Sequence, residues 1–111
     1  MATPLPGLPS RGSHSGQPIM ALFDLLGRRW TMRLLWELRS GPKSFRALQK
    51  ACGGVSPSVM NTRLKELRAS LLVENQNEGY VLTSLGDHLM KTLDPLRDWS
   101  RDWAAVLDEG G

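Results

Sequence analysis

Hydrophobic residues follow a helical spacing over most of the chain but not in its first part. Residues 1–16 are rich in Pro, Gly and Ser and have no periodic apolar positions, so we expect a disordered tail there. From residue 17 to 108, apolar positions recur mainly at intervals of three and four, with a short change of period in between. This pattern predicts one domain of helices with a small β-hairpin.

Four helices are predicted before the hairpin, at residues 18–26, 30–39, 45–51 and 56–70. Pro18 and Pro57 suit a first helical turn, where a backbone N–H is not needed. Ser44 and Ser56 can cap the third and fourth helices by accepting hydrogen bonds from free N–H groups. The expected helix ends are marked by glycines, at Gly27, Gly41 and the pair Gly53-Gly54.

The period changes after the fourth helix. Residues 72–74 and 80–82 read as two short strands, and residues 75–79 between them contain turn-forming types. Thr83 can then cap a final helix with an apolar stripe that continues to Leu107. We expect Pro95 to kink this helix or to divide it in two.

Two short helices joined by a glycine turn and followed by a hairpin are typical of a winged helix-turn-helix. The predicted fold class is therefore mainly α with a small β-hairpin, and residues 17–108 form the winged helix-turn-helix domain with a C-terminal helix. In such folds the second helix of the pair, here at about residues 56–70, enters the major groove of DNA.

The predicted recognition helix has two distinct faces. If Met60, Leu64 and Leu67 are buried, the opposite face carries short polar groups and one cation, namely Ser58, Asn61, Thr62 and Lys65. Such side chains let the helix approach base edges; an Asn can pair with adenine, and a Thr methyl can touch thymine. We take these four residues as base-reading candidates, and the alternative is an ordinary solvent-exposed face.

Five further residues are candidates for phosphate contact: Lys43, Arg46, Gln49, Ser56 and Arg63. The first three lie on or just before the helix that should cross the DNA backbone, where simple solvation is the alternative. Arg63 lies between the two faces of the recognition helix. It can hold a phosphate, or it can bond a helix carbonyl or Glu66 as a structural arginine, and the sequence leaves both roles open.

The charge distribution supports a polyanionic partner. Residues 28–68 contain ten Lys and Arg against two Glu, for a net charge of +8, whereas residues 69–111 contain three basic and eight acidic residues, for a net charge of −5. The whole chain has a net charge of +3. A basic middle segment followed by an acidic end is expected where one segment binds DNA and the other stays away from it.

Several classes of function find no support. The single cysteine, Cys52, excludes an internal disulfide and a cysteine-rich zinc site, and its expected fate is burial rather than a sensor role. No His is paired with a nucleophile, and no metal-ligand spacing or phosphate-binding glycine loop occurs, so we predict no enzyme, no metal and no cofactor. We expect no membrane segment and a cytoplasmic location.

The aromatic residues divide into two groups. Trp30 and Trp36 are expected in or near the core. Trp99 and Trp103, four apart late in a small domain, cover one helix face and suggest contact with a partner chain; packing onto the protein's own first helix is the alternative. The dimer-interface candidates are Leu22, Leu89, Leu93, Leu96, Trp99 and Trp103. A small-molecule effector at the dimer seam is a further option that the sequence does not support.

Taken together, the segments Leu25–Thr31 (LLGRRWT), Leu38–Leu48 (LRSGPKSFRAL), Val55–Leu67 (VSPSVMNTRLKEL) and Leu82–Gly86 (LTSLG) resemble the HxlR-type regulators, relatives of the MarR group. The resemblance covers about residues 18–107. It implies a homodimeric DNA-binding regulator whose dimer is built on the first and the C-terminal helices.

Two features depart from the family pattern, one before the first helix and one in the wing. Many members have a cysteine just before the proline that opens the first helix, and here Gln17 precedes Pro18, so a redox switch at that position is not available. The wing is short, with Glu74 and Glu78 beside it and no arginine to enter a minor groove.

The sequence thus predicts a transcriptional regulator that binds double-stranded DNA sequence-specifically as a homodimer. The alternative from another class is a winged-helix module for protein interaction, which the same fold can serve.

Overall fold

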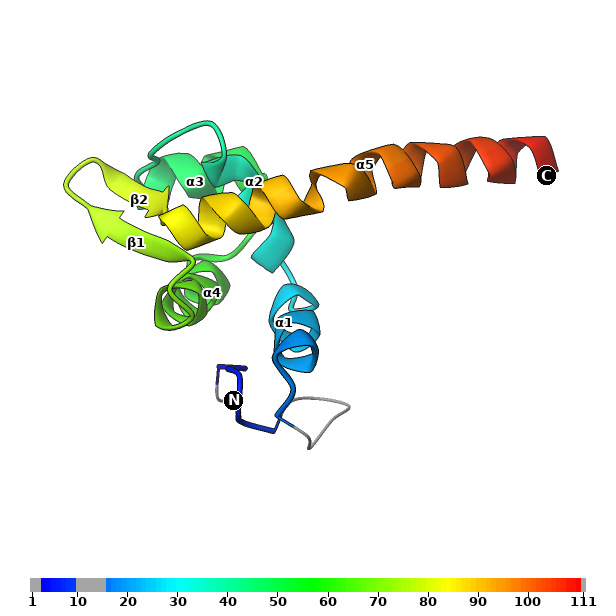
Figure 1. Cartoon of the computed structure of the whole chain (residues 1–111). Helices are drawn as coiled ribbons and strands as arrows, with labels where there is room; N and C mark the ends of the chain where they lie inside the picture. Colours follow the sequence, from blue (N-terminus) through cyan, green and yellow to red (C-terminus); the bar gives the residue numbers. More distant parts are fainter. Residues whose placement is uncertain (1–2, 10–15, 111) are drawn as a thin grey trace.

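Five helices and one two-stranded hairpin follow one another in the computed structural model, which describes residues 3–9 and 16–110 (Figure 1). The elements are α1 (Pro18–Leu26), α2 (Thr31–Leu38), α3 (Phe45–Cys52), α4 (Pro57–Ala69), β1 (Val73–Gln76), β2 (Gly79–Leu82) and α5 (Ser84–Gly110). This order confirms the predicted fold class of helices with a small hairpin, and α3, α4 and the hairpin form the expected winged helix-turn-helix.

The core lies where α2, α3 and α4 meet the hairpin and the start of α5. Leu34 and Leu35 of α2 and Met60 of α4 have no exposed surface. Leu64 and Leu67 are buried together with Met60, so the apolar face predicted for the fourth helix does lie in the core. The remaining buried apolar residues of this cluster include Leu38, Leu48, Val55, Leu72, Val73 and Met90.

The hairpin turn is shorter than the sequence suggested. β1 and β2 pair from Val73 with Leu82 to Gln76 with Gly79, which leaves a turn of two residues where five were expected. Gly79 makes this possible, because it adopts φ +120°, a conformation that other residues rarely adopt.

The wing is tied to the loop before α3. Lys43 and Tyr80 exchange two backbone hydrogen bonds, with N···O distances of 3.1 and 2.8 Å. Lys43 thereby extends the hairpin by one bridge, and the wing keeps a set position beside the helix-turn-helix.

The helix α5 is continuous, so the expectation that Pro95 divides it is wrong, and the alternative of a kink at Pro95 stays a prediction. Pro95 cannot donate to the carbonyl of Lys91, but both residues are exposed and water can satisfy that carbonyl. The first half of α5 packs on the body through Gly86 and Met90. Leu93 is half-buried, all residues from Asp94 to Gly110 are exposed, and this exposed part projects from the body as an arm (Figure 1).

The N-terminal tail is only partly described. Residues 1–2 and 10–15 of the predicted disordered tail lie outside the described residues, so that expectation stays a prediction. Among the described residues of the tail, Pro4 is buried and lines a cavity together with Ala21 and Leu25 of α1.

Gly86 is the position where α5 lies closest to the chain before β1. A Cβ atom there would stand 2.1 Å from the carbonyl oxygen of Leu72. Gly→Ala normally stabilises a helix, but here we expect Gly86→Ala to lower the free energy of unfolding by about 2 kcal/mol, because the backbone must shift. Urea denaturation followed by circular dichroism measures this. Gly110→Ala, with open space around it, is the control, and equal stability of the two variants would contradict the prediction.

Candidate nucleic-acid interface

Both helices of the helix-turn-helix begin with a serine cap. The Ser44 hydroxyl accepts a hydrogen bond from the Ala47 N–H at 3.1 Å, and the Ser56 hydroxyl accepts one from the Val59 N–H at 3.2 Å. Pro57 follows Ser56 at the first helical position, as predicted. The remaining N–H groups of these first turns are suited to phosphate oxygens.

The four base-reading candidates share one exposed face of α4. Ser58, Asn61, Thr62 and Lys65 are all exposed, opposite the buried face. The Thr62 hydroxyl donates to the Ser58 carbonyl oxygen at 3.0 Å. Its hydrogen is therefore used inside the helix, whereas its oxygen lone pairs and its methyl group remain available on the exposed face.

Some of the phosphate candidates lie at the surface, whereas another is engaged in a hydrogen bond within the fold. Arg46 is exposed on α3, and Lys43 lies at the wing bridge with its Nζ 3.1 Å from the Ser40 hydroxyl. Gln49 instead donates from Nε2 to the carbonyl oxygen of Val55 at 3.2 Å. Gln49 thus supports the turn between α3 and α4, a role that the sequence did not indicate.

The contacts of Arg63 favour the structural alternative. Its Nε donates to the Arg29 carbonyl oxygen at 3.0 Å, and its guanidinium binds a Glu66 carboxylate oxygen at 2.6 Å. Glu66 is one of the two partners expected for a structural arginine, whereas the Arg29 carbonyl belongs to the turn between α1 and α2 and not to a helix. Together these bonds hold the guanidinium against the body of the domain.

Glu66 is the centre of a buried ion cluster. Its second carboxylate oxygen accepts a hydrogen bond from Arg28, and the Arg28 Nε lies 3.6 Å from Asp24. The side chains of Asp24, Arg28 and Glu66 are only 3, 6 and 7% exposed. The cluster joins the end of α1 to the inner side of α4.

Asp24 and Arg28 were not among the residues that the sequence singled out. The available signal was their spacing of four residues, which places opposite charges on one side of a helix end. Glu66 lies 38 positions from Arg28, so no local pattern indicated their contact.

The wing carries carboxylates and amides. Glu74, Asn75, Gln76, Asn77 and Glu78 are exposed, and the Gln76 amide donates to a Glu74 carboxylate oxygen at 2.6 Å. The strands and turn from Val73 to Leu82 contain no Lys or Arg, so this wing offers DNA only neutral donors.

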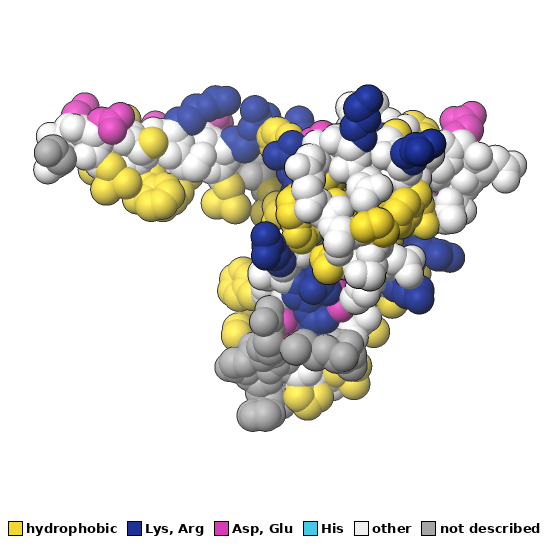
Figure 2. Space-filling model, turned by 180° about the vertical axis from the view of Figure 1, so that it is seen from behind, with side chains coloured by type: hydrophobic (Ala, Val, Ile, Leu, Met, Phe, Trp, Pro, Cys, Tyr) yellow, Lys and Arg dark blue, Asp and Glu magenta, His cyan; other side chains and the backbone are white. Residues whose placement is uncertain are grey.

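The tryptophans at the C-terminal end stand on the arm. Trp99 and Trp103 are stacked, with ring centroids 5.8 Å apart, and they are 61 and 55% exposed. They therefore do not pack onto the chain's own α1, which was the alternative to a partner chain. Figure 2 shows hydrophobic side chains gathered along one edge of the projecting arm.

The other dimer-interface candidates differ in how far they are exposed. Leu96 is 58% exposed, whereas Leu22, Leu89 and Leu93 are half-buried, and Leu22 and Leu89 line one apolar cavity. Two exposed residues of α1, Ile19 and Phe23, and two near the end of α5, Val106 and Leu107, extend the apolar surface beyond the predicted set.

Trp30 and Trp36 differ from each other in burial. Trp30 is half-buried and packs against the core, as expected, whereas Trp36 is 39% exposed. Two arginine side chains lie over the exposed Trp36 ring, Arg39 at 3.7 Å and Arg97 at 4.9 Å from the ring centroid, in cation–π contact.

Cys52 is the last residue of α3 rather than part of the following turn, and its thiol is buried. Burial raises the pKa of the Cys52 thiol above its usual value; the charge of Arg33 opposes this, and that of Glu37 adds to it. A raised pKa means less thiolate at neutral pH, which favours a buried structural cysteine over a redox sensor.

Among the described residues, no three or more His, Cys, Asp or Glu gather into a group suited to a metal ion. Every helix in the described part of the chain is too short or too polar to span a bilayer.

Comparison with known proteins places this geometry in a family. The model of the HxlR-like helix-turn-helix family matches residues 25–108. YodB, an HTH-type transcriptional regulator from Bacillus subtilis, is 31% identical over 85 residues, which cover 70% of this chain and 76% of YodB. An uncharacterized HTH-type regulator from Methanocaldococcus jannaschii, MJ0925, is 27% identical over 88 residues, covering 76% of this chain and 83% of that protein.

Solved structures agree with this assignment. The crystal structure of quinone-bound YodB superposes with a TM-score of 0.72 and 31% identity, covering 76% of this chain and 96% of that chain. A structure described as a possible HxlR family transcriptional factor from Thermoplasma volcanium gives a TM-score of 0.67 at 28% identity, covering 84% of this chain and 86% of that chain.

The ion cluster predicts a large effect of losing Glu66. We expect Glu66→Ala to lower the free energy of unfolding by about 3 kcal/mol, because two arginines lose their partner in a buried setting. Chemical denaturation measures this. Asp98→Ala is the control, since it removes an exposed pair with Arg101 at 3.4 Å and should cost under about 0.5 kcal/mol. A small effect for both variants would show that the cluster does not stabilise the fold.

Proposed function

The chain belongs to the HxlR-like helix-turn-helix family of transcriptional regulators, and from this we propose that it binds operator DNA sequence-specifically as a homodimer. The observation that carries this proposal is the division of α4 into a buried apolar face and an exposed face of short polar side chains. A solvent-exposed helix face gains nothing from short side chains, whereas a helix in the major groove needs them for close approach.

Base reading in this proposal depends mainly on Asn61 and Thr62. Both are exposed on the first half of α4, the part that contacts base edges when a recognition helix enters the groove. The Asn61 amide can donate to and accept from adenine, and Thr62 offers its methyl group to thymine. Ser58 and Lys65 continue the same face at its two ends.

Phosphate binding positions the helix without reading sequence. Arg46 supplies an exposed cation on α3, and Lys43 supplies a second one at the base of the wing. The first turns of α3 and α4, capped by Ser44 and Ser56, add backbone N–H groups. The acidic arm, by contrast, stays away from the DNA.

A homodimer accounts for the apolar edge of the arm. Leu96, Trp99 and Trp103 expose more than half of their surface on one helix face, and Phe23 of α1 is 60% exposed. A second copy related by a twofold axis can cover these residues, and it places two recognition helices on half-sites about one helical turn apart. Binding two half-sites together also strengthens each weak half-site contact. A regulator of this kind acts where the chromosome is, which for a bacterial-type regulator is the cytoplasm.

The acidic, cation-free wing favours one second candidate, a protein-interaction module without specific DNA binding. The basic segment around α3 and α4 opposes it. Equal, weak binding to operator and random duplex would move this candidate to first place.

Asn61→Ala tests sequence reading. We expect the variant to lose about tenfold to a hundredfold in affinity for duplex from the protein's own upstream intergenic region, because one bidentate base contact is removed. Its affinity for a shuffled duplex should change less than about twofold. Fluorescence anisotropy at several salt concentrations measures both. Equal losses on both duplexes would contradict the assignment of Asn61.

Arg46→Ala is the matched variant for the same assay. It should weaken binding to both duplexes similarly and reduce the salt slope by about one, because a phosphate contact carries no sequence information.

Trp103→Asp tests the dimer. We expect at least about a tenfold weaker self-association, because a charge replaces a large apolar group inside the proposed interface. Sedimentation velocity measures the assembly, and anisotropy should show operator affinity falling with it. The monomer should keep its fold, since Trp103 lies on the exposed arm. Asp102→Asn, at the neighbouring position, is the control. An unchanged assembly for Trp103→Asp would rule out this face as the dimer contact.

A further inference from the structure

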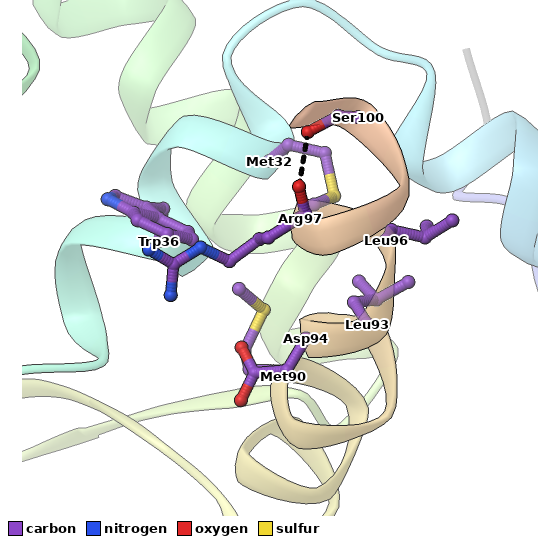
Figure 3. Close-up of a pocket in the computed structure, with 8 residues that line it drawn as sticks. All are labelled: Met32, Trp36, Met90, Leu93, Asp94, Leu96, Arg97 and Ser100. Carbon is purple, nitrogen blue, oxygen red and sulfur yellow. Dashed lines mark hydrogen bonds between the residues drawn. The ribbon is translucent and has the colours of Figure 1, made fainter. Parts of the chain in front are cut away.

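A cavity of about 190 Å³ lies between α2 and α5, at the base of the arm (Figure 3). Met32 and Trp36 of α2 form one wall, and Met90 and Leu93 of α5 form the other. Two charged side chains of α5, Asp94 and Arg97, lie at its edge, and Arg97 reaches across toward Trp36. The site joins a helix of the DNA-binding body to the helix that carries the arm.

The size and lining of the cavity suit a single aromatic ring. An apolar cavity of about 150 Å³ is enough to hold benzene. The thioethers of Met32 and Met90 make favourable contacts with aromatic rings, and Trp36 adds an aromatic wall.

The charges at the edge favour a carboxylate on that ring. Arg39 and Arg97 both lie over the Trp36 ring, whereas Asp94 is the one acidic residue of the lining. Among the ion pairs of the described residues, none involves Arg97 or Asp94. A guanidinium stacked on a ring keeps its N–H edge free, so Arg97 can bind a carboxylate with two hydrogen bonds without leaving Trp36.

The cavity adjoins the proposed dimer face, but most of its lining lies on another side of α5. Met90, Asp94 and Arg97 point to the α2 side of α5, whereas Trp99 and Trp103 lie on the apolar edge of the arm. Only Leu93 and Leu96 border both surfaces. Asp94 and Arg97 therefore lie outside the apolar edge that the second copy is proposed to cover.

We propose that this cavity is an effector site for a monocyclic aromatic carboxylate, with Arg97 as its anion-binding residue. The binding site stands on the cavity itself, and only its effect on DNA rests on the proposed function. A ligand here touches both α2 and α5, so it can favour one arrangement of the arm against the body over another.

Benzoate binding to the full-length chain, measured by isothermal titration calorimetry without DNA, tests the site. We expect a dissociation constant on the order of 1 mM or tighter for a ligand of this size. Arg97→Gln should weaken binding at least about fivefold because the charge-assisted hydrogen bonds are lost. Asp94→Asn should strengthen it by about threefold because a like charge is removed.

Two controls separate recognition from general disturbance of α5. Arg101→Gln, one turn further along the helix, should leave benzoate affinity unchanged within about twofold. Benzamide, the neutral analogue, should respond to neither Arg97→Gln nor Asp94→Asn, since it carries no charge for them to attract or repel. Absence of benzoate binding at 10-fold the expected dissociation constant, or effects of the same sign for both charge variants, would overturn the site.

The regulatory effect has its own test. Saturating benzoate should change operator affinity by at least about threefold, and operator DNA should change benzoate affinity by the same factor, because such coupling is reciprocal. Benzoate binding without this change would overturn the effector role. Failure to bind any operator would count against the proposed function alone, because the calorimetric result does not depend on DNA.

Discussion

The buried carboxylate of Glu66 sets the position of the recognition helix in this structure. It holds Arg28, which follows α1, and Arg63 of α4 itself, while Arg63 also reaches the Arg29 carbonyl oxygen. Charged groups are costly to bury unless each has a partner, so the turn after α1 and the helix α4 pack most favourably in the arrangement that keeps all these groups paired.

The position of α4 matters because its two faces have opposite requirements. Met60, Leu64 and Leu67 must stay in the core, and Asn61 and Thr62 must stay outside it. The Gln49 amide on the Val55 carbonyl and the Ser56 cap set where the helix begins. Tyr80 and Lys43 set where the wing lies beside it. Each of these contacts is polar and directional, so the surface offered to DNA is largely preformed.

Local signals in the sequence were enough to predict the elements and the exposed face of α4. Ser56, Pro57 and the spacing of Met60 and Leu64 act within one or two helical turns, and they predicted the helix correctly. The ion cluster was missed because its members are distant in sequence, and the role of Arg63 stayed open for the same reason. Division of α5 at Pro95 was wrongly expected, because a solvent-exposed helix tolerates a proline that a buried one would not.

The length of α5 has a mechanical consequence. Its exposed part, residues 94–110, spans roughly 25 Å at the usual rise of a helix. It acts as a lever arm whose pivot is the region where α5 leaves α2, so a rotation of a few degrees at the pivot displaces the tip by one or two ångströms. If two such levers are joined, that displacement is transmitted to the spacing between the two recognition helices, and DNA tolerates little error in that spacing.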